Sequence, residues 1–142
     1  MLKAKINLID KNLPIPKYQT SGSVGFDIYS RKNITIQPGK IILIPTNLII
    51  QVPKNYFLLI AARSSLPIKK GLVIANGIGV LDQDYCGPND EILLEVLNIT
   101  RKNIKVKRGE RLAQGILVRI DKAKFNRKKI YCNNRGGCGS TG

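Results

Sequence analysis

The sequence contains no histidine, and only nine of its 142 residues are acidic. A general base in this chain must therefore be a carboxylate, Lys, Tyr or Cys, so each carboxylate in a suggestive place gains weight. The H-E-x-x-H and H-x-E…C-x-x-C patterns are impossible without histidine, and zinc deaminase chemistry is excluded with them. The sequence also has no G-x-x-x-x-G-K-[ST] phosphate loop.

Cysteine is scarce as well. Cys86, Cys132 and Cys138 are odd in number and show no C-x-x-C spacing, which predicts a reducing compartment, no disulfide framework and no structural zinc. No apolar run approaches the ~20 residues of a membrane-spanning helix. Residues 1–10 lack the apolar core of a signal peptide. We therefore expect a cytoplasmic protein without a membrane partner.

The charge is strongly one-sided, because 24 Lys and Arg residues give a formal net charge of +15. Basic chains of this kind can bind nucleic acid or another polyphosphate. The lysines are nevertheless scattered along the whole chain, with a denser patch only at Arg127-Lys128-Lys129. A biased genome is an alternative explanation, so nucleic acid is not expected to be the main partner.

The length and the 43% apolar content predict one globular domain with a real core. Short apolar or alternating segments and recurring turn signals are typical of an all-β sandwich, jelly roll or barrel. Asn76-Gly77 is a strong hairpin signal, and residues 64–70 favour a short helix that Pro67 limits. The expected strands are residues 3–9, 34–36, 40–44, 47–52, 56–62, 72–75, 78–81, 91–98, 103–107 and 113–120.

Asp82 and Asp84 are the first candidates for chemistry. They occupy alternate positions beside Tyr85, so in an extended chain both face the same side. A buried aspartate beside a metal-bound or phosphate-bound water is the obvious general base in a chain without histidine. The alternative interpretation is a polar hairpin end.

Arg63, Ser64 and Ser65 follow the most apolar predicted strand. A guanidinium with hydroxyl donors suits a phosphate. A helix start with Ser64 or Ser65 as its N-cap is the competing and compatible interpretation, because a helix N-terminus itself favours anions.

Three further segments are weaker by themselves. In residues 22–27 an acid, Asp27, stands between glycine and a strand, and a plain turn is the alternative. In residues 109–114, Gln114 lies in an apolar strand and needs a hydrogen-bond partner if it is buried. The glycine-rich residues 135–142 offer backbone N–H groups, hydroxyls and Arg135 to a polyanion. They are either a disordered end or a flap that closes over a phosphorylated ligand.

Together these five segments, in this order and spacing, resemble the trimeric dUTPase family, the deoxyuridine triphosphate nucleotidohydrolases. The resemblance covers essentially the whole chain. The matching segments are residues 23–27, 63–72, 76–85, 109–114 and 135–142.

The resemblance implies hydrolysis of dUTP to dUMP and pyrophosphate with Mg²⁺ as cofactor. It assigns Asp82 to the water that attacks the α-phosphorus, and Arg135 to closure over the phosphates. Asp27 and Gln114 would reach the metal through waters. The substrate-binding residues implied are Arg63, Ser64, Ser65, Asn76, Gly79, Leu81, Tyr85, Gln114, Cys138, Gly139, Ser140 and Thr141.

The family also implies a jelly-roll-like β-barrel and a homotrimer with exchanged C-terminal arms. Residues 1–120 would form the barrel, and residues 121–142 the arm and the glycine-rich flap of the same domain. Each site would draw on more than one subunit, which suits a chain whose motifs are spread from Asp27 to Thr141.

Two departures from the family pattern stand out. Cys86 and the residues Pro88-Asn89-Asp90 change the end of the third motif, which predicts a reshaped hairpin or surface loop. Cys138 stands where an aromatic ring normally stacks on the base, at a loss of about 1–3 kcal/mol. These departures leave open a catalytically silent or regulatory nucleotide-binding protein, and a dCTP-acting deaminase relative is a further alternative.

Overall fold

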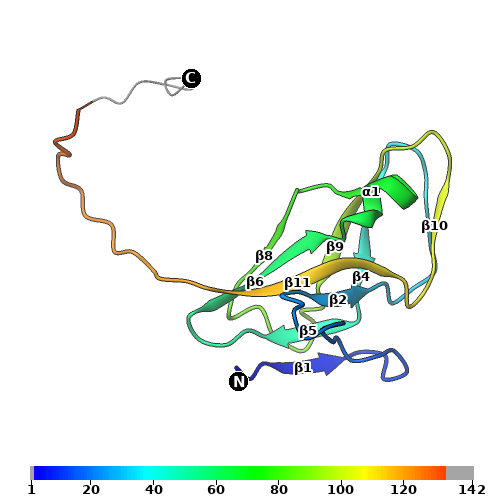
Figure 1. The fold of residues 1–142 in the computed structure, drawn as a ribbon, viewed down its shortest axis with the longest axis horizontal. Helices are drawn as coiled ribbons and strands as arrows, with labels where there is room; N and C mark the ends of the chain where they lie inside the picture. Colours follow the sequence, from blue (N-terminus) through cyan, green and yellow to red (C-terminus); the bar gives the residue numbers. More distant parts are fainter. Residues whose placement is uncertain (1, 134–142) are drawn as a thin grey trace.

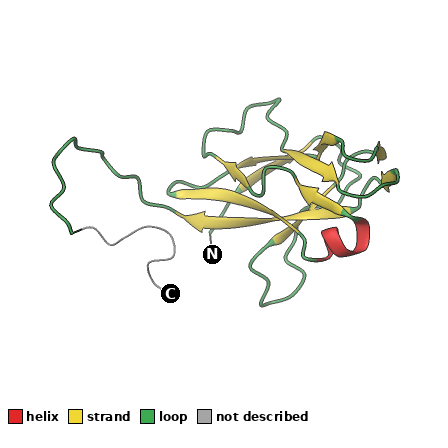
Figure 2. Cartoon of the chain, turned by 90° about the horizontal axis from the view of Figure 1, so that it is seen from above, coloured by secondary structure: helices red, strands yellow, loops and turns green. Residues whose placement is uncertain are grey.

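The computed structural model describes residues 2–133 of the chain. In this part, short strands follow one another with one short helix between them (Figures 1 and 2). In chain order the elements are β1 (Lys5–Leu8), β2 (Phe26–Tyr29), β3 (Ile34–Ile36), β4 (Ile41–Pro45), β5 (Leu48–Gln51), β6 (Tyr56–Ala62), α1 (Ser65–Lys70), β7 (Leu72–Ile74), β8 (Gly79–Leu81), β9 (Leu93–Asn98), β10 (Ile104–Val106) and β11 (Arg111–Arg119).

The strands of the described residues pair antiparallel in seven ladders, which form four sheets. The largest sheet has the order β2-β11-β6-β8, and a second has the order β4-β9-β7. β1 pairs with β5, and β10 pairs with β3. In Figure 1 the long strand β11 crosses the middle of the molecule beside β2 and β6. The all-β class predicted from the sequence is confirmed.

Aliphatic side chains from both larger sheets fill the interior. Alternate residues of β9 are buried, as expected for a strand with one face on the core. Leu58, Leu72 and Val96 have no exposed surface and belong to one continuous apolar cluster. Burial of such side chains contributes about 1.5–3 kcal/mol each, which makes this cluster the main stabilising feature of the fold.

Each strand expected from the sequence is present, with ends that differ by a few residues. β2 is the strand that the pattern did not predict. All four of its residues are buried, including Asp27, so it shows none of the alternation that marks a half-buried strand.

The turn predicted at Asn76-Gly77 is present, because Gly77 has a φ of 78° and donates its N–H to the carbonyl of Ile74 at 3.0 Å. The predicted pairing of the two flanking strands is wrong. β7 pairs with β9, whereas β8 pairs with β6. The chain crosses from one sheet to another at this turn, so the two strands find their hydrogen-bond partners elsewhere.

The short helix is confirmed as α1 and ends at Gly71, whose φ of 64° is left-handed. A Cβ at this position would lie 2.1 Å from Cγ2 of Thr100. Glycine is therefore required at position 71 both by the turn and by the loop that follows β9.

Beyond β11 the chain leaves the body of the molecule. The N–H of Ile120 still donates to the carbonyl of Asn55 at 2.9 Å. Residues 121–133 then run outward in an extended path (Figure 1, orange) and are all exposed. Phe125 is 94% exposed and Tyr131 is 84% exposed. Nζ of the neighbouring Lys129 lies 5.3 Å from the centroid of the Tyr131 ring, but neither aromatic side chain is buried.

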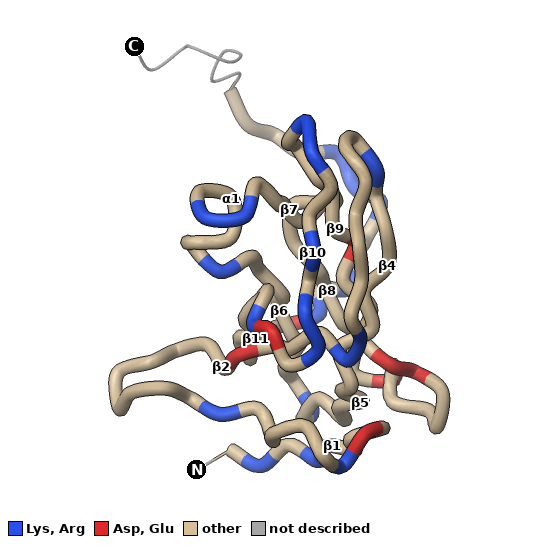
Figure 3. Tube along the Cα trace, turned by 90° about the vertical axis from the view of Figure 1, so that its right-hand side faces the viewer, with Lys and Arg blue, Asp and Glu red and all other residues tan. Residues whose placement is uncertain are grey.

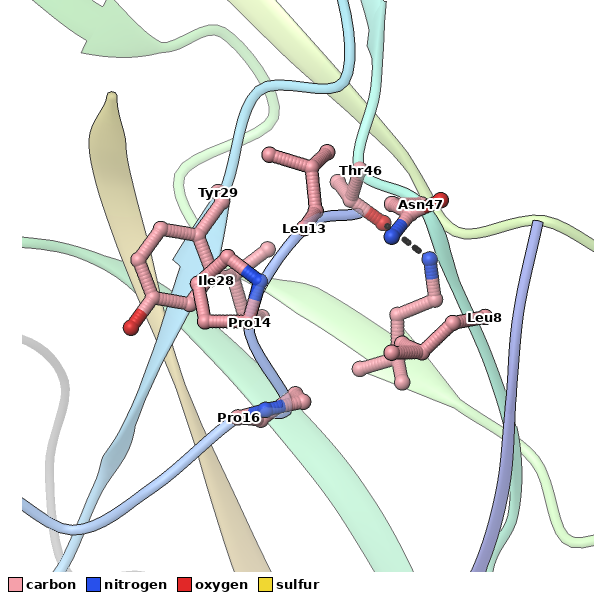
Figure 4. A pocket seen from close by; sticks show the side chains of 9 residues that line it. Leu8, Leu13, Pro14, Pro16, Ile28, Tyr29, Thr46 and Asn47 are labelled. Atoms are coloured by element: carbon pink, nitrogen blue, oxygen red, sulfur yellow. Dashed lines mark hydrogen bonds between the residues drawn. The ribbon is translucent and has the colours of Figure 1, made fainter. Parts of the chain in front are cut away.

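A small hollow lies where the loop after β1 packs against β2 and β5 (Figure 4). Leu13, Pro14 and Pro16 line it from the loop, with Ile28 and Tyr29 from β2. Its volume of about 10 Å³ holds one water at most. The hollow is therefore a small gap in the packing between the loop and the strands, and it is too small for a ligand. No helix within residues 2–133 is long and apolar enough to cross a membrane.

Candidate active site

Asp27 is the centre of a polar cluster at one end of the largest sheet. It is 6% exposed, and its carboxylate has three partners. Nε of Arg63 lies 3.2 Å from Oδ1, and Nη1 of Arg111 lies 3.1 Å from Oδ2. Nε2 of Gln19 donates to Oδ2 at 2.7 Å. These contacts compensate the burial of the charge and fix the direction of both guanidinium groups.

The two arginines keep part of their surface accessible. The side chain of Arg63 is 32% exposed and that of Arg111 is 41% exposed. Each guanidinium carries five N–H donors, and the contacts with Asp27 use one edge. The remaining donors are positioned for a phosphate or another carboxylate.

Gln114 of β11 completes the cluster, because its Cα stands opposite that of Asp27 in the β2–β11 ladder. Its Nε2 donates to the carbonyl of Ala62 at 3.4 Å. A Cβ on Gly25 would lie 2.8 Å from Oε1 of Gln114. Glycine at position 25 thus leaves room for this amide. Asp27, Gln19, Arg63, Arg111 and Gln114 are called the Asp27 cluster below.

The two serines that follow Arg63 stand beside the cluster, at the start of α1. Ser64 occupies the N-cap position, but its side chain makes no capping hydrogen bond. The predicted N-cap position of Ser64 is thus confirmed, although without the capping hydrogen bond, and Ser65 is the first residue of the helix. Ser64 is exposed and Ser65 is half-buried.

A second polar segment, residues 76–85, runs along the other edge of the same sheet through β8. Asn76, Asp82 and Asp84 are exposed, and Gly79 and Leu81 are half-buried. Tyr85 is 39% exposed, and its hydroxyl donates to the carbonyl of Glu91 at 3.4 Å. This segment is called the β8 segment.

The strand register separates the two groups. Leu81 stands opposite Leu58 on β6, so Asp82 lies beyond it toward Phe57. Gln114 stands opposite Ala61, about four residues or roughly 13 Å further along β6. Asp82 instead shares a pocket with Tyr56, Phe57, Ile120 and Lys122, where β11 ends. One chain therefore does not bring Asp82 to the arginines.

Five of the predicted site residues belong to the tail that begins at Arg135. Arg135, Cys138, Gly139, Ser140 and Thr141 all lie outside the described residues. No group of three or more His, Cys, Asp or Glu side chains within residues 2–133 is arranged to hold a metal ion.

Sequence reasoning missed two members of the Asp27 cluster. Arg111 stood in a recognised motif without an assigned role, and Gln19 had no motif at all. The signal for Arg111 was a cation next to a buried strand in a chain with few acids. Nothing in the local sequence marks Gln19, because its partner Asp27 becomes buried only through the tertiary structure.

A family model described as dUTPase matches residues 11–142. The chain belongs to the dUTPase family. It is 37% identical to a deoxyuridine 5'-triphosphate nucleotidohydrolase from Finegoldia magna, over 97% of this chain and 99% of that protein. The resemblance found in the five motifs is thereby confirmed.

Two solved structures show the same fold. A dUTPase from Streptococcus mutans is 33% identical, with a TM-score of 0.79 over 84% of this chain and 98% of that chain. A dUTPase of Staphylococcus bacteriophage 80alpha, solved with dUPNHPP, has a TM-score of 0.84 at 22% identity, and the match covers 100% of this chain and 99% of that chain. The second is a likeness of fold alone.

The departure from the family pattern after Tyr85 forms a closed surface turn. Gly87 donates its N–H to Oδ2 of Asp90 at 2.6 Å, and the N–H of Asp90 donates to the carbonyl of Gly87 at 3.1 Å. Cys86 is half-buried, with Sγ 3.9 Å from the carbonyl of Gln83. A reshaped loop was expected here, and the turn is held by its own residues.

Glu91 anchors that loop to the core. Nε and Nη2 of Arg31 each donate to its carboxylate at 2.8 Å, and the N–H of Asn47 donates at 2.7 Å. Burial alone would raise the pKa of Glu91, but the hydrogen bonds from Arg31 and Asn47 outweigh it and lower the pKa. The charged form of Glu91 is therefore the one that fits the native structure.

Proposed function

We propose that this member of the dUTPase family hydrolyses dUTP to dUMP and pyrophosphate, by attack of water on the α-phosphorus. The observation that carries the proposal is the Asp27 cluster, in which residues of the first, second and fourth motifs meet. A chance likeness between short motifs would not bring Asp27, Arg63 and Gln114 to one point. The family match over residues 11–142 supports dUTP hydrolysis as the reaction, and we propose that this arrangement serves it.

The Asp27 cluster is proposed as the binding site for the triphosphate. Asp27 is held by two guanidinium groups and an amide, so its role is to aim Arg63 and Arg111 at the phosphates. The hydroxyls of Ser64 and Ser65 add neutral donors at the same end of α1. Such prepositioned donors stabilise negative charge as it develops on the phosphates.

Mg²⁺ is the proposed cofactor. The donor set fits a water-mediated role, because Asp27 is committed to Arg63 and Arg111 while Gln114 presents an amide oxygen near Gly25. Oxygen atoms of the triphosphate would supply the direct ligands. When bound, the ion neutralises charge on the phosphates and orients them.

Asp82 is the proposed general base. It lies at the end of β8 in a chain without histidine, and its pocket beside Tyr56 and Phe57 is open to solvent water. A carboxylate there would take the proton of the attacking water as the oxygen bonds to phosphorus. Asp84 shares the pocket and is the natural comparison for any test of this assignment.

The β8 segment is proposed to read the base and the sugar. β8 is an edge strand of its sheet in the described residues, so one row of backbone N–H and C=O groups has no strand partner. Gly79 and Leu81 would use such groups on the uracil edge, with Asn76 beside them. A cytosine amino group would meet a donor there and be rejected. Tyr85 would pack under the deoxyribose and exclude a 2′-hydroxyl.

A homotrimer is proposed because one chain leaves the two halves of the site apart. An Asp82 from one protomer would meet the Asp27 cluster of another. The outer face of β4 and β9 supports self-association, since Ile41, Leu43 and Leu93 are between 45% and 58% exposed there. Such apolar surface is typical of an interface. Closure of the sheets into a jelly-roll-like barrel is part of the same proposal.

Residues 121–142 are proposed as an exchanged arm and flap on the barrel of residues 1–120. The support is the outward course of residues 121–133 (Figure 1) and the exposure of Phe125 and Tyr131. Arg135, Ser140 and Thr141 would close over the phosphates, and Cys138 and Gly139 would approach the base. A flap of this kind excludes water from the reacting centre.

A cytoplasmic location stays a proposal that rests on the cysteines. Cys86 and Cys132 are free thiols in the described part of the chain, which suits a reducing compartment.

The purified full chain should be incubated separately with dUTP, dCTP and dTTP in the presence of Mg²⁺, and both pyrophosphate and ammonia should be measured. Pyrophosphate from dUTP alone is the expected result. Ammonia from dCTP would indicate a deaminase relative. Tight binding of dUTP without any pyrophosphate would indicate a silent or regulatory protein.

A further inference from the structure

A hollow between α1 and β10 carries a concentration of positive charge that the proposed reaction does not use. It is formed by the end of α1, the loop after β9 and the strand β10. We call it the α1–β10 groove. Its lining residues are Pro67, Ile68, Lys69, Lys70, Gly71, Thr100, Lys102, Asn103, Ile104 and Lys105.

The basic surface continues past the groove along the chain. A second hollow beside it is lined by Lys70, Lys105, Lys107, Arg108 and Glu110. Figure 3 shows Lys and Arg following one another along β10 and its flanking turns, with the basic end of α1 nearby. Val106, the last residue of β10, is buried, while Lys105 within the strand and Lys107 directly after it are exposed. The two lysines therefore both lie at the surface, on either side of a residue that faces the core.

Acidic residues neutralise only part of this surface. Glu110 pairs with Lys70 at 2.6 Å, and Asp10 pairs with Arg108. Lys69, Lys102, Lys105 and Lys107 make no salt bridge within residues 2–133. Four ammonium groups thus remain available for a ligand whose negative charges are spaced along a line.

The Lys70–Glu110 pair also shapes the groove. Nζ of Lys70 donates to the carbonyl of Lys105 at 2.7 Å, which ties the end of α1 to β10. The α1–β10 groove is therefore held in shape by contacts within the chain, and its exposed lysines lie on a structured surface.

We propose that the α1–β10 groove, together with the basic hollow beside it at Lys107, binds the phosphodiester backbone of duplex nucleic acid. Lysine ammonium groups along a concave path neutralise phosphates without reading bases. Thr100 and Asn103 add neutral donors that also suit phosphate oxygens. No aromatic side chain is among the lining residues, so the groove lacks the stacking platforms that favour single strands.

An anionic membrane is the less suitable partner for the same charge. Ile68 is 88% exposed at the groove, but one aliphatic side chain gives little apolar area for insertion into a bilayer. The concave shape also suits a rod-like polyanion better than a flat surface. Binding is independent of dUTP hydrolysis, because none of the four unpaired lysines belongs to the proposed catalytic machinery.

The test is a fluorescence anisotropy titration of a labelled 20-base-pair DNA duplex with the full chain, between 50 and 200 mM NaCl. The test variant changes Lys69, Lys102, Lys105 and Lys107 to Gln. We expect at least a tenfold loss of affinity at about 100 mM NaCl. The slope of log K against log salt should be flatter by up to about 3.6, since each of the four neutralised phosphates contributes about 0.9.

Two control variants test whether the position of the lysines, and not net charge alone, determines binding. One changes Lys3, Lys5, Lys11 and Lys17 to Gln, and it has the same net charge as the test variant because all four are exposed lysines of another region. The other changes Arg127, Lys128 and Lys129 to Gln. Each control should lose less than threefold in affinity. The test variant and the variant at Lys3, Lys5, Lys11 and Lys17 should also keep their thermal stability and dUTP turnover.

Three outcomes would overturn the proposal. The first is an equal loss of affinity in the test and control variants, which would mean that net charge alone drives binding. The second is a loss confined to the Arg127-Lys128-Lys129 variant. The third is a wild-type chain that leaves the duplex free at 50 mM NaCl, whether or not it binds vesicles containing phosphatidylserine.

Discussion

The Asp27 cluster and the β8 segment lie on the same sheet, but they differ in how complete they are within one chain. The cluster has its hydrogen-bond partners in place and holds its carboxylate 6% exposed. The β8 segment presents exposed acids. Its strand β8 pairs with β6 on one side and has no strand partner on the other side within the described residues. The proposed phosphate-binding half is therefore preorganised by folding, whereas the half proposed to read the base and accept the proton would depend on association with another protomer.

The largest expected effect comes from Asp82→Asn, which keeps the shape of the side chain and removes its basicity. We expect kcat for dUTP to fall by about 10²–10⁴, the usual contribution of a general base. Affinity for a non-hydrolysable dUTP analogue, measured by calorimetry, should stay within a few-fold of wild type. Asp84→Asn is the matched control, and a larger loss of kcat in that variant would move the assignment to Asp84.

Removal of residues 135–142 should lower kcat by about 10²-fold, because the proposed flap would supply phosphate donors and exclude water. Thermal unfolding should stay unchanged, since the core residues lie elsewhere. Full activity in the truncated chain would show that the tail has no role in the reaction.

Mixing two inactive variants tests the comparison directly. Chains with Asp82→Asn and chains with Arg63→Gln should be co-refolded at equal amounts and assayed with dUTP. If each site takes Asp82 from one protomer and Arg63 from another, about a quarter of the sites regain both residues on random assembly. Activity equal to the mean of the two separate variants would place both residues in the same protomer's site.

The smallest effect is on stability, at Glu91, which holds the loop that follows the β8 segment. Glu91→Gln should destabilise the chain by about 2 kcal/mol at pH 7, the usual value for hydrogen bonds to a charged group. The melting temperature should fall by roughly 5 °C, whereas the exposed Asp121→Asn should leave it unchanged.

The stabilisation that Glu91 provides should depend on pH. The folded-state pKa of Glu91 is lowered, so the stability it contributes is fully present above the pKa of the unfolded chain. It is lost as the pH falls through the folded-state pKa. The difference in melting temperature between wild type and Glu91→Gln should therefore shrink in acid. A difference that stays constant from pH 7 to pH 3 would contradict the role given to this carboxylate.

Much of the candidate site was predictable because its residues stand in ordered motifs. Asp27, Arg63 and Gln114 were expected to act together, and the structure brings them to one place. The predicted N-cap position of Ser64 is also present, but no capping hydrogen bond forms there. Arg111 and Gln19 acquire their role only through the burial of Asp27, which no local pattern reveals.

Strand positions were predictable for a similar reason. Alternation and turn signals report which residues face the core, and this local property located every strand except the fully buried β2. The pairing of the strands was not predictable in the same way. The Asn76-Gly77 turn favoured a local ladder, yet β7 and β8 joined different sheets, because the burial of distant strands outweighs the preference of one turn.

The sequence by itself determined the all-β class, the family and the residue types available for chemistry, since these follow from composition, periodicity and motif order. Only the tertiary structure decided that Asp82 stands apart from the arginines, that Asp27 is locked by Arg63 and Arg111, and that the lysines of α1 and β10 share one groove. The physical reason is that strand register and burial depend on contacts between residues far apart in the chain, which local patterns do not encode.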